Sequence, residues 1–308
     1  LISEIVDEQV CKTSSSILSS SKRYAFVASH IKSVLKRSVS LISEHMNRGE
    51  FVPVGYELSF GYEGEFPAIE VALSSGEKVS IIGKIDRADS MESSEGGTYI
   101  RIVDYKSGNK DFRVGDVYHK LQLQLLVYLD AILTELGKKT GGEMLPAGIL
   151  YFKLDDPLVK TDQEIGDDEL EKKIMCELKM SGLLINDEDI IKCMDSEISG
   201  YSDIIPVRIK ADGTISEASS STATIEQFQA LRAYVRKAIR GICEEILEGN
   251  IEISPYSKKG VAPCRYCSYS SVCQFDPSMK GNRYRILKDI KEEEAWVLIE
   301  KEIDKTVY

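Results

Sequence analysis

An aspartate and a lysine stand two residues apart at the end of an apolar stretch, YIRIVDYKSG, which runs from Tyr99 to Gly108. Side chains alternate between the two faces of a β-strand, so Asp104 and Lys106 point to the same side as Ile102. A surface that only packs against other residues needs neither charge. The pair therefore indicates either a strand end that reaches water or a site of chemistry.

A second aspartate, Asp86, ends another strand-like stretch, VSIIGKIDRAD, 18 residues before Asp104. The two strands are expected to be neighbours, which would bring the two carboxylates together. Two carboxylates at adjacent strand ends form a hard oxygen site for Mg²⁺ or Mn²⁺. A lysine beside such a metal, here Lys106, can stabilise developing negative charge or orient an attacking water. Together the three residues favour hydrolysis of a phosphodiester.

The same tripeptide pattern occurs elsewhere, so the pattern alone is a weak signal. An acid two residues before a lysine is also found at Glu171–Lys173, Glu177–Lys179 and Asp289–Lys291. Those three lie in charged segments with helical periodicity, where a solvated helix face is the ordinary explanation. Only the Asp104 pair follows an apolar strand.

A glutamine and a tyrosine in the segment LQLQLLVYL add a third element. Gln124 and Tyr128 are four residues apart and so share one face of a helix, whereas Gln122 is displaced from that face. The pair could position a phosphate or a water molecule. The alternative is ordinary polar decoration of a helix.

Three cysteines, Cys264, Cys267 and Cys273, stand within ten residues. Two thiolates spaced C-x₂-C can hold one metal from a tight turn, and the third adds a further ligand. The residues alone fit zinc with four thiolates or a [4Fe–4S] cluster with a distant fourth cysteine. Nothing indicates secretion, so disulfides are disfavoured. Isolated cysteines are predicted to be small buried hydrophobic residues: Cys11, Cys176, Cys193 and Cys243.

Periodicity predicts the elements that must position these side chains. Helical spacing of apolar residues predicts helices over 22–48, 117–137, 164–180, 224–249 and 286–303. Alternating or apolar runs between turn residues predict strands over 54–60, 99–106, 147–156 and 204–213, and two strands joined by a turn within 68–89. The order of these elements predicts an α/β fold.

Composition excludes several classes of protein. Hydrophobic residues make up 43% of the chain and charged residues 29%, as in globular proteins, and the segments lack the run of roughly 18 apolar residues that a membrane span needs. The net charge of −11 argues against a surface that coats nucleic acid generally, but not against a local acidic site for a divalent metal. No Walker A motif is present, so this chain is not expected to be a nucleotide-driven motor.

Three segments carry a resemblance to a known family. GKIDRAD, IVDYKSG and QLQLLVYL, in this order, resemble the motifs of the RecB-type PD-(D/E)xK nucleases. PCRYCSYSSVCQFD, PVGYELSFG, PAGILYFKLDDPL and EEILEGNIEISPY are similar to segments of the nuclease subunits of bacterial helicase–nuclease complexes, so the similarity extends over nearly the whole chain. The resemblance implies a restriction-endonuclease-like core, in which helices flank a central mixed sheet, with a helical C-terminal extension.

Carried over residue by residue, the resemblance implies a role for each candidate. Asp86 and Asp104 are similar to the acids that bind Mg²⁺ or Mn²⁺, and Lys106 is similar to the catalytic lysine. Gln124 and Tyr128 match the Gln-xxx-Tyr motif of the family and would position the DNA strand.

The resemblance also implies that Cys264, Cys267 and Cys273 are three ligands of a [4Fe–4S] cluster, which would pin the C-terminal region to the nuclease core. In the family the fourth cysteine lies far upstream of the nuclease motifs. It is expected outside this chain, because EQVCKTSSS around Cys11 does not resemble that segment. We therefore expect the cluster to be absent from the chain by itself.

The family supplies an upstream histidine to the metal site, but neither His30 nor His45 stands in a matching context. The chain also begins at Leu1 without an initiator methionine. We expect a piece of a longer polypeptide, in which 1–160 is the nuclease core without its first helical region. Residues 161–308 would be the C-terminal part of the same domain.

By the same resemblance, the partners are expected to be broken DNA ends and a helicase–nuclease subunit that forms a heterodimer with this one in the bacterial cytoplasm. The nuclease would cut the 5′-ended strand during recombinational repair. The alternative is a non-catalytic module that binds DNA ends with a decayed nuclease fold. The intact set of Asp86, Asp104 and Lys106 favours catalysis, because binding alone requires none of them.

Overall fold

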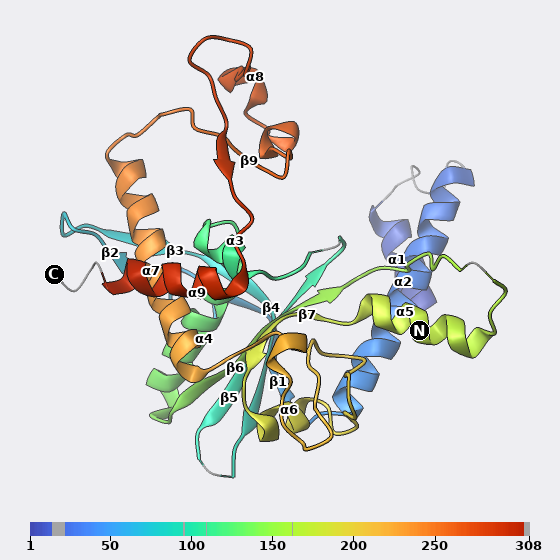
Figure 1. The fold of residues 1–308 in the computed structure, drawn as a ribbon. Helices are drawn as coiled ribbons and strands as arrows, with labels where there is room; N and C mark the ends of the chain where they lie inside the picture. The colour runs from blue at the N-terminus through green and yellow to red at the C-terminus, as the bar shows by residue number, and fades with distance from the viewer. Residues whose placement is uncertain (14–21, 95, 109, 162, 305–308) are drawn as a thin grey trace.

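A six-stranded sheet lies at the centre of the computed structural model, which describes residues 1–13, 22–94, 96–108, 110–161 and 163–304 (Figure 1). The strands follow the order β1-β4-β5-β6-β7-β8. β5 pairs in parallel with β6 and β7 with β8, whereas the other three neighbouring pairs are antiparallel, so the sheet is mixed as predicted. Its strands are β1 (Val52–Phe60), β4 (Gly83–Glu92), β5 (Thr98–Lys106), β6 (Met144–Lys153), β7 (Ser181–Ile185) and β8 (Thr222–Ala223).

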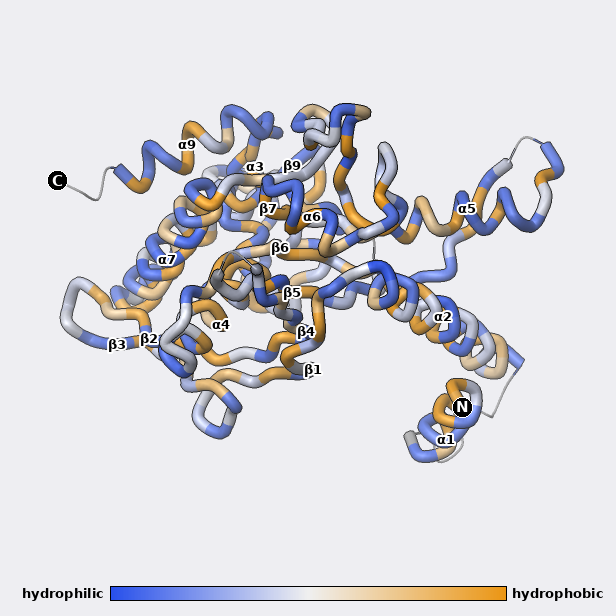
Figure 2. Tube along the Cα trace, turned by 90° about the horizontal axis from the view of Figure 1, so that it is seen from below, coloured by the Kyte–Doolittle hydropathy of each residue, from blue (hydrophilic) through white to orange (hydrophobic). Residues whose placement is uncertain are grey.

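Helices cover both sides of this sheet. α4 and α7 lie on one side, and α2 and α5 on the other (Figures 1 and 2). The described helices are α1 (Ile2–Thr13), α2 (Lys22–Asn47), α3 (Val114–Tyr118), α4 (Gln124–Thr140), α5 (Asp167–Leu178), α6 (Glu188–Met194), α7 (Ile225–Leu247), α8 (Ser270–Cys273) and α9 (Glu292–Asp304), with 3₁₀ turns η1 (Glu217–Ser219) and η2 (Pro263–Tyr266). Two small sheets pair β2 (Ile69–Ala72) with β3 (Lys78–Ile81) and β9 (Tyr256–Lys258) with β10 (Arg285–Leu287). Within these ranges, no helix has the length and apolar character needed to cross a membrane.

The core is built on the two central strands, β5 and β6, which are buried on both faces because helices cover both faces. Ile100, Ile102, Ile149 and Leu150 are fully buried there. Burying an aliphatic side chain of this size contributes about 1.5–3 kcal/mol to folding. Hydrophobic residues accordingly gather along these strands and α4 in Figure 2.

The predicted single helix over 117–137 is wrong, because the chain forms two helices, α3 and α4, with a break between them. Lys120 in the break has a left-handed φ of 62°, which a continuous helix does not allow. His119 Nε2 hydrogen-bonds the carbonyl oxygen of Lys288 at 2.9 Å. α4 also continues past Gly137 to Thr140. The break depends on a contact with a segment far along the chain.

Two strand predictions are also corrected. The stretch after the 74–78 turn is not one strand, because it leaves the small sheet after β3 and joins the central sheet as β4, with exposed Ile82 between them. The segment 204–213 forms only isolated bridges, through Arg208 and Ile209. The last predicted helix begins at Glu292, since Ile286 belongs to β10.

The part of the chain after residue 160, expected to be a largely helical extension with one strand, also takes part in the central sheet. It contributes β7 and β8, which complete the central sheet. The isolated cysteines were wrongly predicted to be buried: Cys11 and Cys176 are exposed, and Cys193 and Cys243 are half-buried. They lie on amphipathic helices, where the thiol is a minor part of the packing.

A buried charged cluster joins β4 and β5 on one face of the sheet. Asp89 Oδ1 accepts a hydrogen bond from Arg87 Nε at 2.6 Å, and its Oδ2 accepts one from Arg101 Nε at 2.7 Å. His45 of α2 packs edge-on against the ring of Phe152, with ring centroids 5.7 Å apart. Burial, followed by the charges of Arg101 and Arg87, lowers the pKa of His45 to about 3. His45 is therefore neutral in the folded protein, where it packs against Phe152 beside the charged cluster.

Acidification is expected to destabilise the protein through His45. The pKa of a histidine is 6.5 in an unfolded chain and about 3 for folded His45, so between these values only the unfolded state takes up this proton. The free energy of unfolding should fall by up to about 1.4 kcal/mol per pH unit as the pH drops below 6.5. Urea unfolding at pH 7, 6 and 5 should show a weaker dependence for His45→Gln. His30→Gln, on the exposed part of α2, is the matched control. Equal slopes for wild type and His45→Gln would contradict the prediction.

Candidate active site

β4 and β5 separate at one end, and the two predicted acids lie where they separate, a place we call the strand fork. The ladder between the strands ends at the pair Arg87 and Val103. Beyond it, β4 stays paired with β1, and β5 stays paired with β6. Asp86 bridges the gap, because its Oδ2 accepts the backbone N–H of Tyr105 at 2.9 Å.

Asp86 and Asp104 face the same side of the sheet. Asp89 and Arg101 meet on one face, where they share a hydrogen bond. Asp86 is three residues from Asp89 along β4, and Asp104 is three residues from Arg101 along β5. Side chains an odd number of residues apart point to opposite faces, and the β4–β5 ladder has no register shift. Asp86 and Asp104 therefore both point to the face opposite Asp89 and Arg101. Continuing the register from Arg87 places Asp86 opposite Asp104.

Asp104 is a buried carboxylate with an unsatisfied oxygen. The residue is 1% exposed, and its Oδ2 lies 2.5 Å from Nζ of Lys106. Despite that short distance, Oδ2 has no hydrogen-bond partner of suitable geometry among the described residues. Burial raises the pKa of Asp104, and the charge of Asp86 adds to the rise, while Lys106 opposes it. A second cation, in addition to Lys106, would relieve the repulsion between the carboxylates of Asp86 and Asp104.

The carboxylate pair fits a divalent metal ion on this evidence. Mg²⁺ keeps several waters and is usually held by one or two carboxylates together with phosphate oxygens of the substrate. Groups of three or more His, Cys, Asp or Glu side chains that could hold a metal are absent from the part of the chain that the structure describes. Asp86 and Asp104 would therefore hold the ion, with other ligands from water and substrate.

The Gln–Tyr pair lies at the start of α4, on the first turn and the next. Gln124 Nε2 donates a hydrogen bond to the hydroxyl oxygen of Tyr128 at 2.9 Å. The ring of Tyr128 packs edge-on against Phe60, with centroids 5.7 Å apart. Phe60 pairs with Gly83 on β4, where a Cβ atom would lie 2.5 Å from the Phe60 ring, so a larger residue than glycine would displace this packing. Tyr128 is thus tied to the strand that bears Asp86.

Gln122 acts separately from this pair. Its Nε2 donates to the carbonyl oxygen of Asp111 at 2.8 Å, and its Oε1 accepts from the backbone N–H of Arg113 at 3.1 Å. Gln122 therefore holds the loop that follows β5. The sequence showed only that Gln122 does not share the helix face of Gln124 and Tyr128.

Neither His30 nor His45 lies beside the two carboxylates. His30 is exposed on α2 and stacks parallel to Phe26 at 6.4 Å. His45 lies beside Arg87 and Arg101, on the face opposite Asp104.

The three clustered cysteines lie on an arm that projects from the sheet at the top of Figure 1. Cys264 is in η2, Cys267 follows it, and Cys273 ends α8. All three are free and at least partly exposed. They do not form a group that could hold a metal among the residues described, so by themselves they do not fit a four-ligand zinc or iron–sulfur site.

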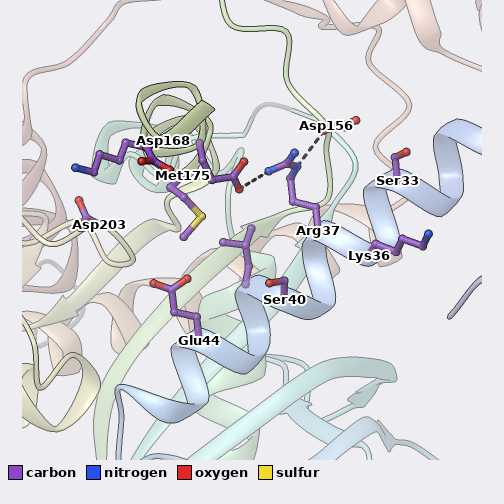
Figure 3. Close-up of a pocket in the computed structure, with 12 residues that line it drawn as sticks. Ser33, Lys36, Arg37, Ser40, Glu44, Asp156, Asp168, Met175 and Asp203 are labelled. Atoms are coloured by element: carbon purple, nitrogen blue, oxygen red, sulfur yellow. Dashed lines mark hydrogen bonds and ion pairs between the residues drawn. The ribbon is translucent and has the colours of Figure 1, made fainter. Parts of the chain in front are cut away.

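A cavity of about 990 Å³ between α2 and α5 contains none of the predicted site residues (Figure 3). Arg37 crosses it, donating to Asp156 at 3.0 Å and to Glu171 at 2.6 Å. Its charged lining comprises five acids and three bases: Glu44, Asp156, Asp168, Glu171, Asp203, Lys36, Arg37 and Lys172. The excess of acids disfavours a phosphate there.

Two residues beside Asp104 were not identified from the sequence. Tyr151 of β6 pairs with Asp104, and burial, together with the Asp104 charge, raises the pKa of Tyr151 to about 12. Lys110 Nζ lies 5.1 Å from the centre of the Tyr151 ring. A tyrosine in an apolar run and a lysine in a polar loop carry no local signal, because only the pairing of β5 with β6 brings them together.

Comparisons with known proteins identify the family of the chain. The profile of the PD-(D/E)XK nuclease superfamily matches residues 1–274. The B subunit of the ATP-dependent helicase/deoxyribonuclease of Clostridium botulinum (strain Loch Maree / Type A3) is 54% identical over 303 residues, 98% of this chain and 26% of that protein. The proteins of the same name from Clostridium tetani and Acetivibrio thermocellus are 52% and 46% identical, again over 98% of this chain and 26% of theirs. The chain thus spans about a quarter of the length of these relatives.

Proposed function

The chain belongs to the PD-(D/E)XK nuclease superfamily, and on this basis we propose that it hydrolyses phosphodiester bonds of DNA with Mg²⁺ or Mn²⁺ as cofactor. The observation that supports the proposal most is the carboxylate pair at the strand fork. Asp104 Oδ2 is buried beside Lys106 Nζ, at 2.5 Å and without a hydrogen bond of suitable geometry among the described residues, and Asp86 points to the same face. A buried carboxylate in this state fits a cation ligand better than a packing residue.

Each proposed role follows from the position of the side chain. When bound, the divalent ion would act as a Lewis acid that polarises the scissile phosphate. Asp86 and Asp104 would hold it. Lys106, already within 2.5 Å of Asp104, would stabilise the negative charge that develops on the phosphate as water attacks. Gln124 and Tyr128 would position the strand through their linked amide and hydroxyl groups.

We place this nuclease in a larger assembly, because its relatives are named as subunits of an ATP-dependent helicase/deoxyribonuclease. The whole protein would be of the AddB type and would act in the bacterial cytoplasm. Its partner would be an AddA-type helicase–nuclease. The substrate would be the 5′-ended strand of a broken duplex. The protein would act on it as an exonuclease during recombinational repair. In that longer protein, Cys264, Cys267 and Cys273 would supply three ligands of a [4Fe–4S] cluster, the fourth coming from outside this chain.

Metal-dependent degradation of single-stranded DNA tests the proposal. The chain should shorten an end-labelled linear oligonucleotide in Mg²⁺ or Mn²⁺ and stop when EDTA is added, because the carboxylates need a cation to engage the phosphate. A covalently closed circular single strand is the matched control, and it should survive if cutting begins at an end. Binding of the oligonucleotide without cleavage in either metal would favour the non-catalytic DNA-binding alternative.

A further inference from the structure

A cavity of about 420 Å³ adjoins the candidate active site where β5 and β6 end. Tyr151 lines it and is the strand partner of Asp104, and Lys153 lines it and is the partner of Lys106. Residues paired across a ladder point to the same face, and neighbouring strands are about 4.8 Å apart. The cavity therefore begins one strand away from the proposed catalytic residues, and its size lies within the range of ligand pockets, about 300–1,000 Å³.

The charged lining of this cavity is more basic than acidic, in a chain whose net charge is −11. Lys110, Lys153 and Lys179 line it, against Asp111 and Glu177. The three lysines come from three separate elements: the loop after β5, the end of β6 and the segment between α5 and β7. The electrostatic field of such a cluster attracts phosphate. The larger cavity between α2 and α5, in contrast, is lined by more acids than bases.

Contacts with β6 and β7 hold the loop that carries Lys110. Ser181 Oγ donates to the carbonyl oxygen of Lys110 at 2.8 Å, so the loop is tied to β7. The ammonium group of Lys110 lies over the Tyr151 ring, and its charge acts on Asp104. Lys179 Nζ donates to the carbonyl oxygen of Ser202 at 3.3 Å. Lys153 Nζ lies 3.7 Å from Asp155 Oδ2. Side chains held by such contacts lose less conformational entropy when they bind a ligand.

We propose that this cavity binds a backbone phosphate of the DNA strand adjacent to the phosphate that is cut, with Lys110, Lys153 and Lys179 as the contacting cations. This inference rests on the proposed nuclease function and adds to it a positioning subsite. Lysines there would hold the strand in register with Asp104 and take no part in bond cleavage. Their loss should therefore weaken substrate binding more than the chemical step.

The experiment measures binding of a fluorescent oligothymidylate to the 308-residue chain in Ca²⁺ at several salt concentrations. For single strands, the slope of log K against log[salt] is about −0.7 for each phosphate neutralised. Replacing all three lysines by alanine should make the slope less steep by about 0.7, because the one phosphate bound in the cavity loses its cations, and Lys110→Ala alone should cause a smaller change in the same direction. Lys110→Arg, which keeps the charge, should restore the wild-type slope. In Mn²⁺ the triple variant should show a KM raised on the order of tenfold with kcat within about twofold of wild type.

Lys192→Ala is the control for charge, since Lys192 is an exposed lysine on α6, away from the cavity, that pairs with Asp189. An unchanged salt slope in both Lys110→Ala and the triple variant would overturn the subsite, whether or not the chain cleaves DNA. Absence of cleavage by the wild-type chain, with normal lysine-dependent binding, would instead overturn the proposed nuclease function and leave the phosphate subsite standing.

Discussion

Asp104→Asn is expected to reduce DNA cleavage by about 10²–10³-fold, the size of effect seen when one preorganised charge-stabilising group is removed from an active site. Asparagine keeps the shape of the side chain but loses the negative charge that would hold the metal. Because burial raises the pKa of Asp104, the charged carboxylate is disfavoured in the folded protein. The neutral variant should therefore unfold at the same or a higher temperature. Loss of activity without loss of stability identifies a functional carboxylate.

Two measurements separate this effect from general damage. Mn²⁺ binding, followed by calorimetry, should weaken in Asp104→Asn and in Asp86→Asn, since the two carboxylates are proposed to share one ion. Asp189→Asn changes an exposed aspartate of α6 by the same chemistry and should leave both metal binding and cleavage unchanged. Cleavage by Asp104→Asn within a few-fold of wild type would show that Asp104 serves the fold alone.

Asp89→Ala is expected to lower the free energy of unfolding by about 3–5 kcal/mol, because it leaves buried charges without their partner. Arg87 and Arg101 both donate to this one carboxylate, and their side chains are almost completely buried. Arg87 already has a buried nitrogen, Nη2, without a hydrogen-bond partner among the described residues. Removing Asp89 would leave two guanidinium groups between β4, β5 and α2 with no counter-charge.

Urea unfolding at pH 7 checks this prediction. A loss of this size is a large part of the roughly 5–15 kcal/mol that stabilises a typical domain, so a marked shift of the midpoint is expected. Asp189→Ala removes an exposed salt-bridge partner and should change stability by no more than about 1 kcal/mol. A loss below about 1 kcal/mol for Asp89→Ala would mean that water or a rearranged side chain compensates the arginines.

The strand fork also explains why the site could be anticipated only in part. The alternation of side chains along β5 places Asp104 and Lys106 on one face, and helical spacing places Gln124 and Tyr128 together. These are local periodicities, which hold for any strand or helix wherever it lies in the fold. They do not indicate that the pairing of β4 with β5 stops at Arg87 and Val103, or that Asp86 accepts a backbone N–H of Tyr105.

Segments with weak or mixed periodicity were predicted least well. β7 is short and was missed, although its Gly182 lets β6 approach so closely that a Cβ atom would lie 2.0 Å from the Ile149 carbonyl oxygen. The break before α4, where His119 contacts Lys288, was also missed. Propensity summed along a window contains no information on such contacts.

The sequence by itself determined the types of most of the elements, the faces on which the candidate residues stand, and, through three short motifs, the superfamily. Only the tertiary structure decided which charges meet. It joins Lys110 and Tyr151 to Asp104 through the β5–β6 pairing, and it separates His45 from the carboxylates by the thickness of the sheet. The physical reason is that local geometry follows from the backbone repeat of a few residues, whereas burial, pKa and charge pairing depend on residues that are distant in the chain and adjacent in space.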